Sequence, residues 1–296
     1  MMDICVYHRN DLDGKCSAAI VLHRYPEVEL IPYNYGDEFD SEVCRGKKVV
    51  FVDCSLQPFQ RLMDLGGICD LVVIDHHKTF IEAVEASDEL TFRTLMSSKE
   101  AGCELTWRWC HDSLGRTMPR AVEMLGRYDR WDLGDGVMEF QYGARSLDLE
   151  PRSALWPRML GDDYRLVDSI FEDGHAILGY VAQHNANLCK VASFEATLQT
   201  PNGDLRCICI NSPLGNSQIF KSVWDPERHD AMLVFFKSNQ DYWSVSLYTE
   251  KDINVGEYAK SMGGGGHEKA AGFQMDNRNL PPGITVDPLS LFKEFK

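Results

Sequence analysis

Histidine and aspartate side chains follow three short apolar segments in the first 80 residues of the chain. They are His8, Asp11 and Asp13 after residues 4–7, Asp53 after residues 49–52, and Asp75, His76 and His77 after residues 71–74. Each apolar segment has the length and the β-branched content of a buried strand. The carboxyl ends of parallel strands meet at one edge of an open α/β sheet, where ligands bind. We therefore expect these side chains to gather at one site.

Carboxylates and imidazoles together are the ligands of a divalent cation such as manganese, magnesium, zinc or iron. Aspartate in a loop often serves only a turn, but three strand ends that all carry Asp or His favour a metal site. The set contains no cysteine, which argues against structural zinc. Its carboxylates exceed what one catalytic zinc needs and suit two ions that share a bridging carboxylate. Two such ions, ~3.5–4 Å apart, can hold a phosphoryl group and activate water.

Two later segments could add to such a site. Residues 127–132 (RYDRWD) follow a predicted helix and offer Asp129 or Asp132, although a charged helix end is the alternative interpretation. Four glycines at 263–266 precede His267, and their bare backbone N–H groups could enclose phosphate oxygens. The glycine segment is neither a Walker A loop nor a zinc-protease motif, because Ala271 stands where the second histidine would be.

The elements that must position these residues alternate in type. The predicted strands cover residues 4–7, 28–33, 49–52 and 71–74, and the predicted helices between them cover 14–25 and 58–65. Short, wholly apolar strands separated by helices predict a doubly wound parallel sheet. Ser97 and Glu100 have the spacing of a capping box that opens another helix, and Pro119 is expected to start the next one.

The second half of the chain has a different pattern. One long helical stretch is predicted to link two domains, and strands at 205–211, 231–236, 243–248 and 270–275 with a short helix at 255–262 follow it. We expect an α/β fold with a catalytic domain at 1–160, a linker helix at 161–190 and a smaller α/β domain with a mixed sheet at 191–296.

Composition excludes several classes of protein. The 45 acidic and 30 basic side chains give a net charge of −15, which disfavours a surface that tracks long nucleic acid. No apolar run is long enough to span a membrane, and the N-terminal residues lack the features of a secretory signal. The ten scattered cysteines form no CxxC pair and are typical of reduced core residues. We therefore expect a cytoplasmic protein.

Taken together, the motifs resemble those of the DHH family of phosphoesterases, with the DHH-associated C-terminal domain of the first subtype. The sequence Asp75-His76-His77 is similar to the motif that names the family. The segment from His8 to Gly14 resembles the first motif, Asp53 the second and Asp129 the fourth. The GGGGH segment with the following AAGF resembles the signature of the C-terminal domain.

The resemblance implies two manganese ions, for which magnesium or cobalt could substitute. His8, Asp11 and Asp53 would hold one ion, and Asp13, Asp53, His76 and Asp129 the other, with Asp53 as the bridge. His77 would face the scissile phosphate, and Asp75 would orient a histidine. The segment Gly263, Gly264, Gly265, Gly266 and His267 would hold the far end of the substrate. Lys78 and Arg130, which lie inside the motifs, are further candidates for substrate binding.

The expected function is hydrolysis of phosphodiester or phosphate bonds in short oligonucleotides or dinucleotides. Two alternatives use the same metal centre, namely hydrolysis of inorganic polyphosphate or pyrophosphate and hydrolysis of cyclic dinucleotides. A third is a non-catalytic sensor that binds metal or nucleotide. The expected partner is a short oligonucleotide, a dinucleotide or another small phosphorylated substrate, and assembly into a homodimer is left open.

Overall fold

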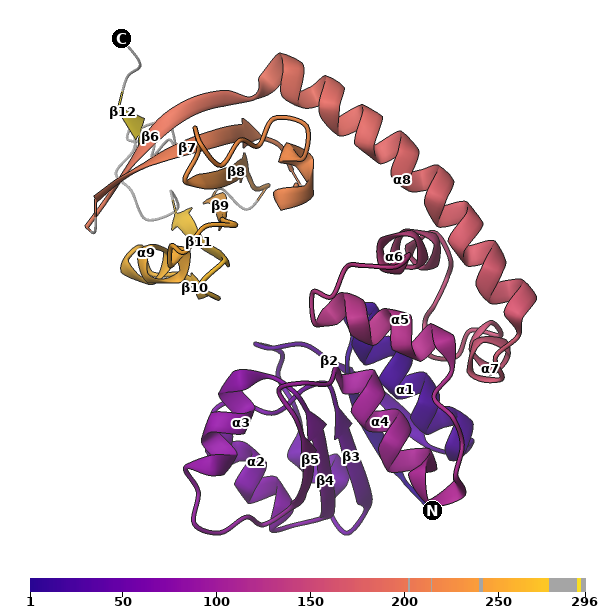
Figure 1. Ribbon diagram of the computed structural model, residues 1–296. Coiled ribbons are helices and arrows are strands. Elements are labelled where there is room, and N and C mark those ends of the chain that lie inside the picture. The colour runs from indigo at the N-terminus through magenta and orange to yellow at the C-terminus, as the bar shows by residue number, and fades with distance from the viewer. Residues whose placement is uncertain (202, 214, 240–241, 277–291, 294–296) are drawn as a thin grey trace. The chain divides into compact units, whose positions relative to one another are not determined.

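The computed structural model describes residues 1–201, 203–213, 215–239, 242–276 and 292–293. It divides into two units, Met1–Leu178 and Gly179–Lys296. The boundary lies inside one long helix, α8 (Tyr164–Ala192), which matches the predicted helical stretch (Figure 1). Each unit is described by itself.

The first unit contains a five-stranded sheet in which every strand pairs in parallel with its neighbours. The strands are β1 (Ile4–His8), β2 (Glu29–Tyr33), β3 (Lys48–Val52), β4 (Asp70–Asp75) and β5 (Arg93–Met96), in the order β2-β1-β3-β4-β5. This order confirms the predicted doubly wound parallel sheet. It also has a switch point between β1 and β3, from which the chain winds in opposite directions and where such sheets bind ligands.

Helices cover both faces of this sheet (Figure 1). One face carries α1 (Leu12–Arg24), α4 (Gly102–His111), α5 (Arg120–Asp129), α6 (Val137–Arg145) and α7 (Trp156–Leu160), and the other carries α2 (Phe59–Gly66) and α3 (Lys78–Glu85). Short 3-10 helices lie at Ser41–Cys44 and Asp112–Leu114. Alternate strand residues enter the two cores, so that Val50 and Val52 face α1 and α4 whereas Val49 and Phe51 face α2.

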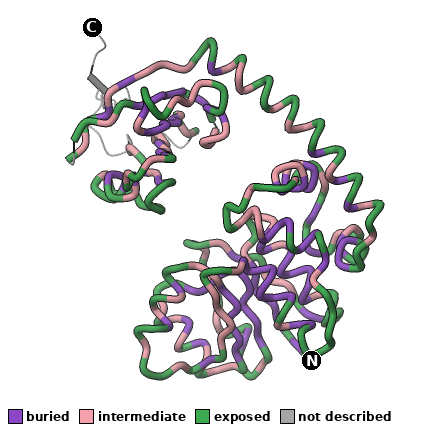
Figure 2. The backbone as a smooth tube through the Cα atoms, viewed as in Figure 1, coloured by how far each residue is buried: buried purple, intermediate pink, exposed green. Residues whose placement is uncertain are grey.

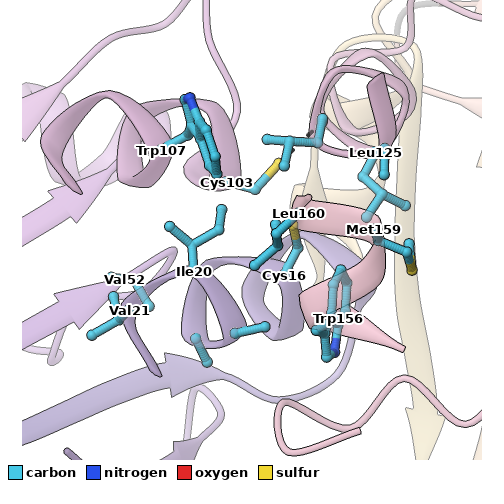
Figure 3. Close-up of a cluster of buried hydrophobic side chains, with 14 of the residues drawn as sticks. Cys16, Ile20, Val21, Val52, Cys103, Trp107, Leu125, Trp156, Met159 and Leu160 are labelled. Carbon is cyan, nitrogen blue, oxygen red and sulfur yellow. Dashed lines mark hydrogen bonds between the residues drawn. The ribbon is translucent and has the colours of Figure 1, made fainter. Parts of the chain in front are cut away.

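The core under α1 and α4 fixes the two helices that reach the candidate site. Figure 3 shows Cys16 and Ile20 of α1 packed near Cys103 and Trp107 of α4, with Leu125 of α5 beside them. Each fully buried aliphatic side chain of this kind contributes ~1.5–3 kcal/mol. The N-terminal ends of α1 and α4 are therefore held rigidly at the carboxyl edge of the sheet.

The start of α4 corrects one prediction. The proposed capping box at Ser97 and Glu100 is wrong, because the helix begins only at Gly102 and Ala101 is its N-cap. The Ser97 hydroxyl instead accepts a hydrogen bond from Lys99 N in a local turn. The first N–H groups of α4 donate to Asp13, 89 and 90 residues away in the sequence. The tertiary contact with Asp13 and the local bond from Ala101 N to the Glu104 side chain thus fix this helix start together.

The second unit contains a mixed seven-stranded sheet in the order β10-β11-β9-β8-β7-β6-β12. The strands are β6 (Phe194–Thr200), β7 (Gly203–Asn211), β8 (Ala231–Lys237), β9 (Tyr242–Tyr248), β10 (Gly265–Gly266), β11 (Ala270–Asp276) and β12 (Phe292–Lys293). Only β7 and β8 pair in parallel among the pairs described. Helix α9 (Val255–Ser261) packs on one face, and a 3-10 helix at Ser217–Phe220 packs on the other.

The burial pattern agrees with the predicted role of the cysteines. Figure 2 shows buried residues along the strands of the first sheet, and nine of the ten cysteines are buried. Cys207 and Cys209 enter one core of the second unit, whereas Ile208 and Ile210 enter the core on the opposite face. Among the described residues, no helix has both the length and the apolar character needed to cross a membrane.

Candidate metal centre

The side chains that follow β1, β3 and β4 meet at the switch point of the first sheet. His8 is the last residue of β1, Asp53 directly follows β3, and His76 directly follows β4. Asp53 lies between the two histidines, with Oδ2 3.7 Å from His8 Nδ1 and Oδ1 3.2 Å from His76 Nε2. The two oxygens of one carboxylate therefore face two different imidazoles, as a bridging ligand requires.

Further carboxylates complete a group on each side of Asp53. On one side, Asp11 Oδ2 lies 2.9 Å from His8 Nδ1. On the other side, His76 Nε2 lies 3.2 Å from Asp129 Oδ2 and 3.6 Å from Asp13 Oδ2. Three sets of three side chains have ligand atoms within 4.8 Å of one another. They are His8, Asp11 and Asp53; Asp13, His76 and Asp129; and Asp53, His76 and His77. The structure thus brings together all six side chains predicted to hold metal.

The N-terminus of α4 supports the same carboxylates. Asp13 accepts hydrogen bonds from Gly102 N at 2.8 Å and Cys103 N at 2.6 Å, and its side chain is buried. The position of Gly102 is crowded, because a Cβ there would lie 2.7 Å from Asp53 Cβ. Gly14 is crowded too, since its Cβ would lie 2.0 Å from His8 O. Sequence reasoning missed Gly102, whose role depends on a contact between distant segments.

The backbone at Asp53 is unusual. Its φ angle is +57°, which lies in the left-handed region that residues other than glycine rarely adopt. Asp53 N nevertheless donates to Ile74 O at 2.8 Å, which holds the residue beside β4. Strain of this kind persists where the surrounding structure enforces it, and it is concentrated at functional sites.

Hydrogen bonds fix the rings of two histidines. Asp75 Oδ1 lies 2.7 Å from His77 Nδ1 and also accepts from His77 N at 3.1 Å. His8 Nε2 lies 3.2 Å from Asn34 Oδ1, and the Tyr35 ring contacts His8 and His77 at centroid distances of 5.9 Å. Asn34 and Tyr35 were not predicted as site residues. The one available signal was their position directly after β2, which is also a strand end at this edge.

The charges of the site call for a cation. Burial raises the pKa of Asp13, and neighbouring Asp53 and Asp129 raise it further. Burial likewise raises the pKa of Asp129 to about 6. Burial acts in the same direction on Asp53, but the imidazoles of His76 and His8 beside it outweigh burial and lower the pKa of Asp53 to about 2. Burial and mutual repulsion therefore disfavour the anionic form of Asp13 and Asp129, and positive charge beside these carboxylates would favour it.

Protons supply that charge when no metal is bound. The Asp11 and Asp53 carboxylates raise the pKa of His8 to about 10 against the effect of burial. Burial lowers the pKa of His77, but Asp75 outweighs it and raises the value to about 9. Metal ligation requires neutral imidazole, so an ion would displace these protons and take over their role.

The residues present fit a divalent cation. In the part of the chain that the structure describes, the buried atoms His8 Nδ1 and Asp53 Oδ1 have no partner with hydrogen-bond geometry. Both atoms belong to the groups defined above. Buried polar atoms without a partner are costly in a folded protein, and a bound cation would satisfy both of these atoms once His8 has lost its proton.

Comparisons with known proteins identify the family of the chain. The model of the DHH family N-terminal domain matches residues 3–126, and the model of the DHHA1 domain matches residues 219–284. The chain belongs to the DHH family. No curated protein sequence matches it.

Two solved structures with TM-scores of 0.51 share its fold. An exopolyphosphatase-related protein from Bacteroides fragilis is 11% identical, with a TM-score of 0.51 over 92% of this chain and 86% of that one. The DHH domain of a member of a family of ribosomal proteins is 15% identical, with a TM-score of 0.51 over 93% and 83%. A pGpG-specific phosphodiesterase from Vibrio cholerae is 14% identical over 94% of each chain, with a TM-score of 0.48.

Three other candidate side chains of this DHH protein lie outside the three groups of possible metal ligands. Arg130 binds the Glu104 carboxylate, with Nε 3.0 Å from Oε2, and donates to Lys99 O. Lys78 is highly exposed at the start of α3, 3.7 Å from Glu82. Asp132 accepts from Arg127 Nε at 2.8 Å and is half exposed. Of the two alternatives at 129 and 132, the structure brings Asp129 to His76 and leaves Asp132 in an ion pair.

The glycine segment of the DHHA1 domain forms a tight turn between α9 and β11. Gly265 and Gly266 pair with Gly272 and Ala271 of β11. Gly264 and Gly266 have steric roles, because added Cβ atoms would lie 2.1 Å from Gly272 O and 2.6 Å from Ala271 Cα.

The remaining positions of the turn are less constrained. Gly263 has a positive φ of +81°, whereas none of the described residues lies within 4 Å of a Cβ at Gly265. The His267 side chain is exposed, and its backbone pairs with Ala270. Packing therefore accounts for part of the glycine run but not for Gly265.

Proposed function

We propose that the chain is a two-metal phosphoesterase that hydrolyses phosphodiester or phosphate bonds of short oligonucleotides or dinucleotides. Members of the DHH family are phosphoesterases, and the matches to both domain models support that reaction class. The observation that carries the two-metal proposal is the position of Asp53 between His8 and His76. A carboxylate with one oxygen on each side suits two ions better than one.

The residues have distinct roles in this proposal. His8, Asp11 and Asp53 would hold one manganese ion, and Asp13, Asp53, His76 and Asp129 the other. Bound there, the ions would supply a hydroxide nucleophile and neutralise phosphate charge. Asp75 holds the His77 ring through Nδ1, which leaves Nε2 as the nitrogen that would face the scissile phosphate.

The proposed substrate is short because the chain is strongly acidic. With a net charge of −15, the chain as a whole repels a long polyanion such as a nucleic acid strand. A dinucleotide carries few phosphates, and metal ions with a few local cations can compensate them. The exposed Lys78 beside His77 is one such cation, whereas Arg130 is held by Glu104 and would act on phosphate only by giving up part of that pair.

The glycine segment with His267 is proposed to hold the far end of the substrate. Support comes from Gly265, because the described part of the chain gives no steric or conformational reason for glycine at this position. A residue without a side chain at an open position lets a ligand approach the backbone closely.

A substrate panel tests the proposed function. Linear dinucleotides, a cyclic dinucleotide, a longer oligonucleotide and inorganic polyphosphate would be assayed with manganese, with magnesium and with excess chelator. We expect linear dinucleotides to have the highest kcat/KM with manganese and no hydrolysis with chelator. Turnover that persists in chelator would overturn the two-metal mechanism, and preference for polyphosphate would overturn the substrate class.

A further inference from the structure

Trp131 occupies a position in the first unit that strongly favours glycine. It follows α5 by two residues, and its φ angle is +62°. Asp132 N donates to Arg127 O at 2.9 Å and Trp131 N donates to Tyr128 O at 3.0 Å. These two bonds form the Schellman motif that ends many helices, and the left-handed residue in that motif is usually glycine.

The choice of tryptophan here has a cost and little compensation within the fold. A bulky side chain in the left-handed region is strained by the contact of its Cβ with the backbone. The residue is also 57% exposed, so most of the indole remains in water. Tyr128 contacts the ring from one side, with centroids 6.1 Å apart and planes tilted by 56°. When a residue other than glycine occupies such a left-handed position and gains no burial there, a functional reason for the residue is indicated.

The turn that carries Trp131 is anchored at the metal centre. Asp129, two residues earlier, has Oδ2 3.2 Å from His76 Nε2. Arg130 bonds to Glu104, which lies in the first turn of α4, and to Lys99 O just before that helix. Because two residues of chain span at most ~7 Å, the Trp131 backbone lies beside a predicted metal ligand. The ring is therefore attached to a turn that is anchored at the metal centre.

We propose that Trp131 is a stacking platform for a nucleobase of the substrate. This inference rests on the proposed function and narrows its substrate class to compounds that carry a base next to the scissile phosphate. An exposed indole offers a flat face to a base, and such stacking is tolerant of base identity. Inorganic polyphosphate has no group that would use the ring.

A substrate–variant cycle tests this inference. Wild type, Trp131→Phe and Trp131→Gly would each be assayed on a dinucleotide and on two analogues that lack one base or the other. We expect Trp131→Gly to lower kcat/KM for the dinucleotide about tenfold to a hundredfold, which is the range for loss of one stacked base. The same variant should have little effect on the analogue that lacks the stacked base. Trp131→Phe should retain most of the wild-type rate.

Stability and binding measurements separate this role from a structural one. Trp131→Gly relieves the left-handed strain, so its thermal unfolding midpoint should be at least as high as that of wild type. A dinucleotide should quench the indole emission of the wild type, and Trp131→Phe should lose that part of the quenching. If the wild type hydrolyses no dinucleotide but shows this quenching, the proposed function fails and the stacking inference stands. Equal losses on all three substrates, or quenching that is unchanged in Trp131→Phe, would overturn the inference.

Discussion

Gly102 lies against the carboxylate of Asp53 so closely that a Cβ at position 102 would be 2.8 Å from Asp53 Oδ1. Gly102 is also the first residue of α4, and its N–H group donates to Asp13. One small residue therefore allows the end of a helix to approach two carboxylates of the metal centre at once.

Gly102→Ala should damage the site while leaving the fold intact. The added methyl group would push Asp53 away from its position between His8 and His76, and misplacement by about 1 Å can cost ~100-fold in rate. We expect hydrolysis to fall at least tenfold and manganese affinity to weaken. Gly179→Ala in α8 is the matched control, because nothing lies within 4 Å of its Cβ. It should leave hydrolysis unchanged, and alanine there should add ~0.5–1 kcal/mol of stability. Normal metal content and rate in Gly102→Ala would contradict the steric argument.

The strand ends of the first sheet could be predicted because their signal is local. Residues 4–7, 49–52 and 71–74 are wholly apolar, and β1, β3 and β4 lie at those positions with at most one additional residue at either end. Once the strands are parallel, their carboxyl ends must share one edge, so His8, Asp53 and His76 are brought together by topology alone.

Features that depend on contacts between distant segments could not be predicted in this way. The cap of α4 by Asp13, the Asn34 contact to His8 and the pairing of Arg130 with Glu104 each join residues at least 26 apart. Strand β5 was missed because Arg93–Met96 is short and only partly buried, and lacks the apolar run that marked the other strands.

The two acidic residues near the end of α5 should differ sharply in their effects. Asp129 faces His76, whereas Asp132 pairs with Arg127 at the surface. Asp129→Asn removes a charge from the proposed second ion site, and we expect a loss of activity of at least a hundredfold with reduced manganese content. Asp132→Asn breaks an exposed pair of the kind that contributes ~0–1 kcal/mol, so activity should stay within about threefold. Metal analysis and initial rates of the two variants test this prediction. A larger loss in Asp132→Asn than in Asp129→Asn would mean that Asp132 is the metal ligand.

Removal of metal should destabilise the first unit but not the second. All predicted ligands lie within Met1–Leu178, and the anionic cluster is left to protons when no ion is bound. At an ion concentration 100-fold above the dissociation constant, binding adds ~2.7 kcal/mol to stability. We expect chelator to lower the unfolding midpoint of the first unit by about 5–10 °C. Hydrogen exchange of β7 and β8 in the second unit is the internal control and should not change. Asp53→Asn should lose the metal-dependent shift, and a shift that persists in it would place the ions elsewhere.

The glycines of the second unit offer a matched pair of substitutions. Gly265→Ala places a methyl group in open space, whereas Gly264→Ala places one 2.1 Å from Gly272 O. We expect Gly265→Ala to keep the unfolding midpoint within about 2 °C and the metal content unchanged, yet to lower kcat/KM for a dinucleotide about tenfold by blocking close approach. Gly264→Ala should instead destabilise the second unit. Full dinucleotide activity in Gly265→Ala would remove the support for a substrate contact at this turn.

The ion pairs of Asp230 should make the stability of the second unit depend on pH. Its carboxylate accepts from Arg206 Nε at 3.0 Å and from Lys251 Nζ at 2.8 Å, which ties β7 to the segment after β9. Hydrogen bonds from Arg206, aided by Lys251, outweigh burial and hold the pKa of Asp230 below its ordinary value of 3.8. A carboxyl group with a depressed pKa in the folded state stabilises the fold above its unfolded pKa, and that contribution is lost as pH falls.

The comparison of wild type with Asp230→Asn isolates this contribution. We expect the wild type to be more stable by a constant amount from pH 7 down to about pH 5, and the difference to shrink steadily as pH falls through about 4 and below. Denaturant unfolding of the second unit, followed by hydrogen exchange in β7 and β8, measures it. Asp252→Asn is the control, because that side chain is fully exposed and lies 3.6 Å from Lys269. A stability difference between wild type and Asp230→Asn that grows towards low pH would mean that burial of the carboxylate, and not its pairing with Arg206, dominates at this position.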